Sequence, residues 1–222
     1  MKPWELLGET RTPDGRLLAL TRRGGEYVIH ADGKALMSSR MHGSEEALAR
    51  LGCRGLARIE RPSVLVGGLG MGYTLRATLD VLPSDATLVV AELIPAVAEW
   101  NRGALGALAG RPLDDRRVRL ELADVAAVLR ASPAAFDAVL LDVDNGPDSL
   151  VAEGNASLYD SAGLAASRAC LRQGGVVAYW SVRDNPRFEK RLRAAGFTVQ
   201  REHVRSRPGK RAFKHTVLLA TA

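Results

Sequence analysis

VLVGGLGMGYTLR, residues 64–76, is the stretch that decides the fold of this 222-residue chain. An apolar run is interrupted by four glycines and then continues with helical spacing, which predicts a strand, a tight turn and the start of a helix. The glycines are Gly67, Gly68, Gly70 and Gly72. Glycine allows positive φ and removes Cβ atoms, and the next helix offers free backbone N–H groups, so we predict a nucleotide-binding turn. A sharp turn that needs glycine for its own sake is the alternative.

A second apolar segment, residues 86–93 (ATLVVAEL), ends in an acidic side chain, Glu92. Buried strands exclude unpaired carboxylates. In a doubly wound fold, the carboxylate that binds ribose hydroxyls lies about 20 positions beyond the glycines, at the tip of the neighbouring strand. The pattern therefore predicts that Glu92 binds the cofactor's ribose. A solvated strand end is the alternative, and an NAD-binding unit would fit this much equally well.

From residue 63 onward, predicted strands and helices alternate, which indicates an α/β fold with a parallel, doubly wound sheet. The predicted strands are 63–69, 86–93, 117–122, 136–143 and 175–181, and the predicted helices are 72–82, 95–109, 124–131, 157–172 and 186–195. Two final strands, 197–203 and 214–221, have no helix between them and are expected to form an antiparallel hairpin. An NAD-binding Rossmann sheet usually lacks such a reversed final pair, whereas S-adenosylmethionine-dependent transferases have it. We therefore predict a seven-stranded, Rossmann-like methyltransferase sheet whose last strand is antiparallel.

The first 40 residues have a different pattern. Short apolar runs alternate with turn signals at Pro13-Asp14-Gly15, Gly24-Gly25 and Ala31-Asp32-Gly33, which predicts a meander of β-hairpins. A helix is expected from Ser44, as the N-cap, to Gly52. The predicted domains are a β-hairpin domain over residues 1–43 and a transferase domain over residues 44–222.

Composition and cysteine usage limit the function classes. With 46% hydrophobic residues the chain can bury one large core. Cys53 and Cys170 form no CxxC pair, which argues against a disulfide scaffold or a cysteine zinc site. No signal peptide is visible and no apolar run reaches the ~18 residues of a membrane span. We expect a cytoplasmic protein without a membrane partner.

The net charge of +6 raises the question of a nucleic-acid partner. The densest basic group, within residues 201–214, surrounds Pro208-Gly209 between the two final strands, and Phe213 is its only interleaved aromatic residue. This pattern favours a solvated loop over a nucleic-acid surface. RNA is kept as an alternative substrate and not as a binding partner.

At this point the chain resembles the spermidine synthase family, the polyamine aminopropyltransferases, within the class I S-adenosylmethionine-dependent transferase superfamily. That family also has an N-terminal β-hairpin domain before a seven-stranded sheet, and its glycine motif ends in Thr-Leu-Arg, as Thr74-Leu75-Arg76 does here. The resemblance implies that Glu92 holds the ribose hydroxyls and that Asp124 faces the adenine amino group. Asp124 is also suited to N-cap the next helix.

The end of the fourth predicted strand carries the expected chemistry. Asp142, Asp144 and Asn145 follow the apolar run 136–141 at the carboxyl edge of the sheet, where open α/β sheets bind ligands. The resemblance implies that Asp142 accepts a proton from an attacking amine, and Tyr159 has the spacing of the family's downstream tyrosine. Asp142, Asp144 and Tyr159 are the candidate catalytic residues, and a helix cap with an Asn-Gly-Pro turn is the alternative. The candidate cofactor-binding residues are Gly67, Gly68, Gly70, Gly72, Glu92, Asp124 and Asp142.

Other positions depart from the family. Asn145 replaces the second aspartate that helps to hold a diamine, and Asp144 is displaced by one position. Gly70 stands where the family has an aspartate, and His42-Gly43-Ser44-Glu45-Glu46 replaces a tyrosine and histidine pair. A glutamine of the family's hairpin corresponds to Leu36 or a neighbour. The nucleoside site is thus expected to be kept and the diamine pocket rebuilt, with His42, Asn145 and Trp180 as candidate acceptor-binding residues.

Three functions follow from this pattern. The main prediction is a methyltransferase that uses S-adenosylmethionine and acts on an amine or hydroxyl, with Arg76 or Arg40 binding the cofactor's carboxylate. The alternatives are an aminopropyltransferase that uses decarboxylated S-adenosylmethionine, and a non-catalytic nucleoside-binding protein. The expected partner is a small-molecule acceptor, and the hairpin domain is suited to form a homodimer, as in related enzymes.

No metal is expected. Asp142 with Asp184-Asn185 resembles the magnesium ligands of catechol-type O-methyltransferases, but residues 180–183 separate that pair from the strand end. His42 and His215 are further candidates for proton transfer, although isolated histidines are more often structural.

Overall fold

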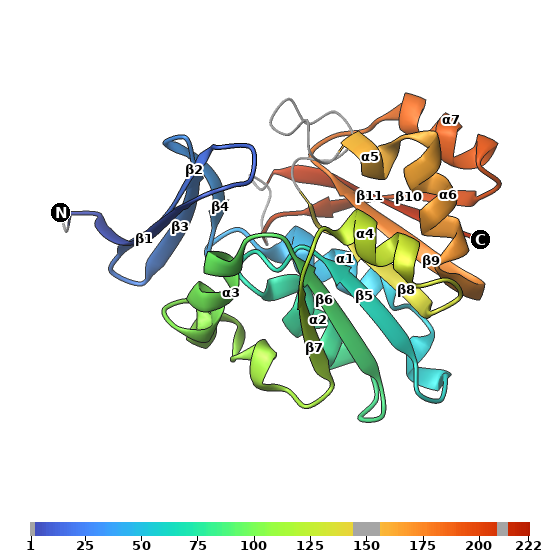
Figure 1. Ribbon diagram of the computed structural model, residues 1–222, viewed down its shortest axis with the longest axis horizontal. Helices are drawn as coiled ribbons and strands as arrows, with labels where there is room; N and C mark the ends of the chain where they lie inside the picture. The colour runs from blue at the N-terminus through green and yellow to red at the C-terminus, as the bar shows by residue number, and fades with distance from the viewer. Residues whose placement is uncertain (1–2, 144–155, 208–212) are drawn as a thin grey trace.

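Two β-sheets organise the molecule: a small one near the N-terminus and a larger one whose strands come from the rest of the chain (Figure 1). The structure is a computed structural model and describes residues 3–143, 156–207 and 213–222. The N-terminal sheet is four-stranded and antiparallel, in the order β1-β2-β3-β4. Its strands are β1 (Glu5–Arg11), β2 (Leu17–Arg23), β3 (Glu26–Ala31) and β4 (Lys34–Ser38). The predicted hairpin meander is confirmed.

The N-terminal sheet is attached to the rest of the molecule by apolar contacts. Leu20 and Ile29 form a small core with Met71, which lies within the glycine turn, and with Leu105. Gly8 in β1 lies against Trp100. A Cβ atom at this position would be only 2.7 Å from the indole nitrogen, so the close contact needs glycine. These contacts fix the sheet beside the carboxyl edge of the larger one. The predicted boundary after residue 43 and the homodimer stay predictions.

The second sheet is seven-stranded, in the order β10-β11-β9-β8-β5-β6-β7. Its strands are β5 (Ser63–Gly67), β6 (Thr87–Glu92), β7 (Val118–Leu122), β8 (Phe136–Leu141), β9 (Leu171–Ser181), β10 (Thr198–Arg205) and β11 (Lys214–Thr221). Strands β5 to β9 pair in parallel, and β11 pairs antiparallel with both β9 and β10. The predicted sheet with an antiparallel last strand is confirmed.

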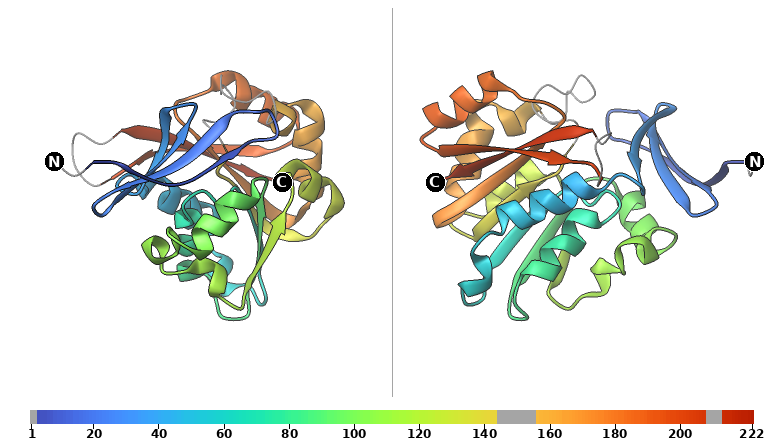
Figure 2. Two further views of the ribbon diagram at one scale, coloured as in Figure 1. Left: turned by 60° about the vertical axis from the view of Figure 1, so that its left-hand side comes forward. Right: turned by 180° about the vertical axis from the view of Figure 1, so that it is seen from behind.

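Helices cover both faces of this sheet (Figures 1 and 2). The α-helices are α1 (Gly43–Gly52), α2 (Tyr73–Val81), α3 (Pro95–Arg102), α4 (Val125–Ala131), α5 (Ala156–Tyr159), α6 (Ser161–Ala169) and α7 (Pro186–Ala194). Short 3-10 helices are η1 (Leu56–Arg58), η2 (Gly106–Ala109) and η3 (Pro112–Asp114). In the described part of the chain, no helix is long and apolar enough to span a membrane.

The alternation of strand side chains divides the core into two layers. Val64 and Val66 of β5 pack with α1, α2 and α3, whereas Leu65 between them packs with α4, α6 and α7. Successive side chains of a strand point to opposite faces, so a nearly continuous apolar strand fills both layers. Cys53 and Cys170 are both free and buried.

Several predicted boundaries differ from the structure, and three elements differ most. The helix predicted over 95–109 ends at Arg102, and a separate 3-10 helix, η2, follows. The backbone at Gly106 lies so close to Asn101 that a Cβ atom would be 2.6 Å from the Asn101 carbonyl oxygen. The helix predicted over 157–172 is divided at Asp160, whose side chain caps α6 by accepting from Gly163 N at 2.8 Å. Strand β9 starts at Leu171, earlier than expected.

The start of α1 corrects another expectation. Ser44 is not the N-cap, because the helix begins at Gly43 and His42 holds the cap position. Ser44 is buried in the first turn, where its Oγ donates to Glu45 Oε2 at 2.6 Å instead of capping the helix. The N–H of Gly43 donates to the carbonyl of Ser206 at 2.8 Å, which ties the start of α1 to the segment after β10.

Candidate functional site

The glycine turn has the tight geometry that the sequence predicts. β5 ends at Gly67, and Gly68, Gly70 and Gly72 have φ values of 88°, 52° and 84°. These values lie in the left-handed region, where a Cβ atom is disfavoured. At Gly68 a Cβ atom would also be 2.6 Å from the carbonyl oxygen of Asp142. The turn therefore needs glycine for its conformation and for its close approach to the end of β8.

Glu92 lies at the end of β6 and binds the glycine turn. Its Oε2 accepts from Leu69 N at 3.0 Å, and its Oε1 accepts from Ile94 N at 2.8 Å. Burial raises the pKa of Glu92, whereas these backbone donors oppose the rise. Asn101, which the sequence did not single out, supports the turn from α3 by donating to Gly70 O at 2.8 Å. The strand end thus presents a preorganised carboxylate beside the turn.

A cavity of about 340 Å³ lies between the glycine turn, the ends of β6 and β7, and the N-terminal sheet; we call it the sheet-edge cavity. Glu92 and Asp124 line it, and so do apolar side chains such as Ile29 and Val97. Asp124 caps α4, because its Oδ1 accepts from Ala126 N at 2.9 Å. The predicted helix cap is confirmed. Apolar walls with a few convergent polar groups are typical of small-molecule sites.

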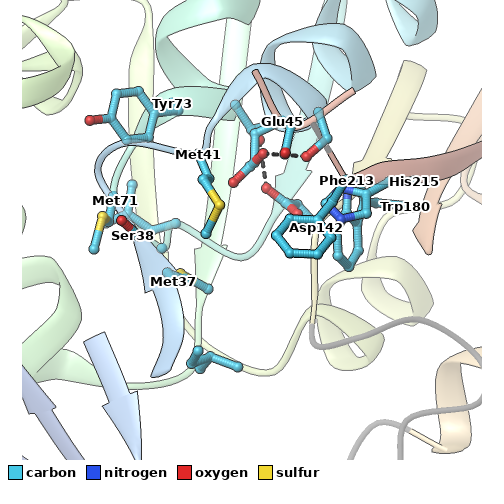
Figure 3. A pocket seen from close by; sticks show the side chains of 16 residues that line it. Met37, Ser38, Met41, Glu45, Met71, Tyr73, Asp142, Trp180, Phe213 and His215 are labelled. Carbon is cyan, nitrogen blue, oxygen red and sulfur yellow. Dashed lines mark hydrogen bonds between the residues drawn. The ribbon is translucent and has the colours of Figure 1, made fainter. Parts of the chain in front are cut away.

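A second cavity of about 210 Å³ adjoins the first, and we call it the acidic cavity (Figure 3). It is formed by β4, the start of α1, the glycine turn and the ends of β8, β9 and the final hairpin. Gly70 and Asp142 line both cavities, as do Leu36 and Met37 from the N-terminal sheet. Asp142 therefore lies where the two cavities adjoin.

Asp142 and Glu45 place two half-buried carboxylates in the acidic cavity (Figure 3). Thr74 Oγ1 donates to Asp142 Oδ2 at 2.6 Å. Burial raises the pKa of Asp142 to about 6, and the Thr74 hydrogen bond opposes this rise. Burial, together with the charge of Asp142, raises the pKa of Glu45 to about 7. Sequence reasoning missed Glu45, whose only signal was its place among the residues that replace the family's tyrosine and histidine.

Three residues that line the acidic cavity carry polar atoms that lack partners. Trp180 Nε1, Ser206 Oγ and His215 Nδ1 are buried atoms without a hydrogen-bond partner among the described residues. The rings of Trp180 and His215 contact each other edge to face, with centroids 4.8 Å apart. Burial lowers the pKa of His215, which favours a neutral imidazole at pH 7. The structure thus places Trp180, but not His42, in this cavity wall.

Two predicted residues line neither cavity. His42 stacks on Tyr73 with ring centroids 4.0 Å apart, and its Nδ1 lies 2.7 Å from Glu46 Oε1. Tyr159 is buried against Tyr179 and Phe188, with its hydroxyl 3.4 Å from Val143 O. Its catalytic role stays a prediction. Asp144 and Asn145 lie outside the described residues.

Arg76 and Arg40, which the sequence suggested for binding the cofactor's carboxylate, pair with other side chains instead. Arg76 pairs with Asp80 at 2.5 Å on the surface of α2, and Arg40 pairs with Glu26 at 3.3 Å. Neither lines a cavity described above. In the described part of the chain, the acidic cavity has no lysine or arginine in its wall.

The magnesium-site alternative gains no support from the geometry. Asp184 pairs with Arg201 at 3.0 Å and with His203 at 3.0 Å, and Asn185 caps α7 by accepting from Phe188 N at 2.9 Å. Within residues 3–143, 156–207 and 213–222, no group of three His, Cys, Asp or Glu side chains is arranged to hold a metal ion.

No protein-family model matches the sequence, and no curated protein matches it. Solved structures match its fold. Spermidine synthase from Thermotoga maritima aligns with a TM-score of 0.75 at 18% identity, covering 97% of this chain and 72% of that one. A spermidine synthase in complex with the transition-state analogue AdoDATO gives a TM-score of 0.74 at 18% identity, with the same 97% and 72% coverage.

A probable spermidine synthase from Corynebacterium glutamicum aligns with a TM-score of 0.64 at 15% identity, covering 97% of this chain and 79% of that one. These alignments confirm the predicted fold, because they include both the N-terminal sheet and the seven-stranded sheet. The fold of this chain is therefore spermidine synthase-like.

Proposed function

We propose that this protein is an aminopropyltransferase-type enzyme, which transfers the aminopropyl group of decarboxylated S-adenosylmethionine to a small amine. The spermidine synthase-like fold and the arrangement of the two cavities support this function over methyl transfer, which was the main prediction from the sequence. The residues that would bind and position each reactant are all at the carboxyl edge of the sheet.

The sheet-edge cavity would bind the adenosine part of the donor. Glu92 would accept hydrogen bonds from the ribose hydroxyls, and Asp124 would face the adenine amino group. The sulfonium would then lie near Gly70 and Asp142, where the two cavities meet. The tail of the donor would enter the acidic cavity beside Glu45.

The charge of the acidic cavity carries the proposal. Glu45 and Asp142 are its charged side chains, and no described lysine or arginine lines it. A cationic amine at the end of the donor tail would be attracted to this cavity, whereas the carboxylate of intact S-adenosylmethionine would be repelled. The same carboxylates would attract an ammonium group of the acceptor.

The reaction needs an uncharged nitrogen in line with the carbon that it attacks. An acceptor ammonium would first lose a proton to the Asp142 and Glu45 pair, whose raised pKa values suit this role near pH 7. The amine would then form a bond to the propyl carbon next to the sulfur. The carbon–sulfur bond would break, and its electron pair would leave with methylthioadenosine.

Calorimetry with decarboxylated and intact S-adenosylmethionine tests the charge argument. We expect the decarboxylated donor to bind at least about tenfold more tightly, and Glu45→Gln to reduce this difference. Tighter binding of the intact donor would contradict the proposal. Donor binding without methylthioadenosine release in the presence of any amine would favour the non-catalytic alternative.

A further inference from the structure

The methionines of the chain are concentrated at the acidic cavity. The sequence has four methionines, and all of them except Met1 line this cavity, namely Met37, Met41 and Met71 (Figure 3). Methionine side chains are flexible and polarizable, and surfaces rich in them pack against apolar groups of different shapes. The wall therefore offers a bound molecule an adaptable apolar surface in addition to its two carboxylates.

Two apolar side chains lie where the acidic cavity meets solvent. Met41 is 37% exposed and Phe213 is 65% exposed, and both line the cavity. The other described residues of the wall are buried or half-buried. Because a residue that lines a cavity and is also exposed marks its opening, the opening presents apolar side chains in the described part of the chain. A ligand that removes these side chains from water gains affinity.

Backbone hydrogen bonds join the segments that carry these two residues. Gly43 N donates to Ser206 O at 2.8 Å, and Ser206 N donates to Phe213 O at 3.0 Å. Met41 lies two residues before Gly43, and its own N–H donates to Ser38 O at 3.0 Å. Met41 and Phe213 thus come from neighbouring segments, and we call the pair the apolar mouth.

The negative charge of the cavity is gathered in one place. Glu45 and Asp142 are the charged side chains of the described wall, and the charge of Asp142 contributes to the raised pKa of Glu45. Such an interaction requires the two carboxylates to be close together. A cationic group of the acceptor therefore binds at this point, and the rest of the molecule lies against the apolar wall.

We propose that the acceptor is an amphipathic amine, whose alkyl or aryl group extends from the reacting nitrogen to the apolar mouth. This inference rests on the proposed function, because it assigns the acceptor class of the same site. The amine lies against Glu45 and Asp142, and the apolar group packs against Met41 and Phe213. These two mouth residues then determine specificity through the apolar area that they bury.

Calorimetry in the presence of methylthioadenosine tests the preference without requiring turnover. The ligands are n-butylamine and n-octylamine, which have the same amine and differ only in the length of the apolar chain. We expect octylamine to bind at least about tenfold more tightly, because its additional methylene groups become buried at the mouth. Octylamine binding no more tightly than butylamine would overturn the inference.

The variant that carries both Met41→Ala and Phe213→Ala removes the apolar mouth. The two side chains are exposed, so the fold should be kept, and the affinities for the two amines should come to within about threefold. Ile59→Ala is the matched control, because Ile59 is 43% exposed and lines neither cavity. It should keep the wild-type preference. A preference for octylamine that survives in the double variant would overturn the inference.

A second copy of the chain is another molecule that could cover exposed apolar side chains. Gel filtration of the wild type and of the double variant separates the two cases. An unchanged oligomeric state together with a lost octylamine preference supports an amphipathic acceptor. A dimer that dissociates in the double variant while the octylamine preference stays the same would assign the mouth to a contact between copies, and would overturn the inference.

A parallel assay separates this inference from the proposed function. Release of methylthioadenosine from decarboxylated S-adenosylmethionine is measured with each amine. Release with the same kcat/KM for butylamine and octylamine overturns the inference and leaves the proposed function standing. No release with either amine, when octylamine binds as expected, contradicts the proposed function and leaves the amphipathic amine as the ligand class of the cavity.

Discussion

Thr74 Oγ1 donates a hydrogen bond of 2.6 Å to Asp142 Oδ2, which joins the first turn of α2 to the end of β8. The glycine turn lies between β5 and α2, so its position and that of Asp142 are coupled through this bond. Thr74 is buried, and its hydroxyl therefore holds the carboxylate in one orientation.

Asp142→Asn should stabilise the fold at neutral pH. The pKa of Asp142 is raised to about 6, so the folded state holds a proton that the unfolded state loses near its ordinary value of 3.8. Stability from this group is complete at pH 3 and is lost as the pH rises through 6. Asparagine can still accept from Thr74, and we expect its melting temperature at pH 8 to rise by about 3 °C or more.

Thermal unfolding followed by circular dichroism at pH 4 and pH 8 measures this effect. The two proteins should differ less at pH 4, where Asp142 is protonated in the folded wild type. Glu45 also contributes to the pH response, because burial and the charge of Asp142 raise the pKa of Glu45 to about 7. A lower melting temperature for Asp142→Asn at pH 8 would show that the carboxylate stabilises the fold.

The same substitution should prevent transfer while the nucleoside still binds. Asparagine cannot take a proton from the acceptor amine, so we expect kcat/KM to fall by at least about 100-fold. Methylthioadenosine binding, measured by calorimetry, should change by less than about threefold. Asp80→Asn, an exposed change on α2, is the control and should keep wild-type activity. Equal loss of binding and transfer would assign Asp142 to donor binding.

Glu92→Gln should weaken nucleoside binding. An amide can accept from Leu69 N or Ile94 N with its oxygen, but its NH2 group would then face the other N–H. We expect the dissociation constant for methylthioadenosine to rise about 10- to 100-fold by calorimetry. Glu99→Gln on α3 is exposed and should bind as the wild type does. Unchanged binding by Glu92→Gln would remove Glu92 from the nucleoside site.

Gly68→Ala should destabilise the protein by about 2–4 kcal/mol, because it combines a φ of 88° with a Cβ contact to backbone. Gly15 provides a matched control, since it has the same φ of 88° and open space around its Cβ position. Gly15→Ala should cost only about 1 kcal/mol from backbone strain. Urea unfolding compares the two, and equal losses would mean that the contact with Asp142 O has no effect.

Local patterns were sufficient to predict the sheet. The apolar run of β5, the positive φ of the turn glycines and the antiparallel final hairpin each follow from residues that are close together in the sequence. The contact of Glu92 with the turn also follows, because ends of adjacent parallel strands share an edge. The predicted N-cap of α1 was wrong, because Ser44 lies inside the first turn and His42 is the cap.

The acidic cavity could not be predicted in the same way. Glu45 comes from α1, Trp180 from the end of β9 and Ser206 from the segment after β10. These residues meet only after the final hairpin packs against the start of α1, and no local spacing indicates that contact. Tyr159 shows the reverse case, because its spacing matches the family and the structure packs its ring among core aromatic side chains.

Product mass after incubation with both donors tests the central claim most directly. The protein is supplied with decarboxylated and intact S-adenosylmethionine and with a pool of small amines, and products are identified by mass spectrometry. The account predicts an acceptor heavier by one aminopropyl group, formed together with methylthioadenosine and absent with Asp142→Asn. An acceptor heavier by one methyl group, formed from the intact donor, would contradict it.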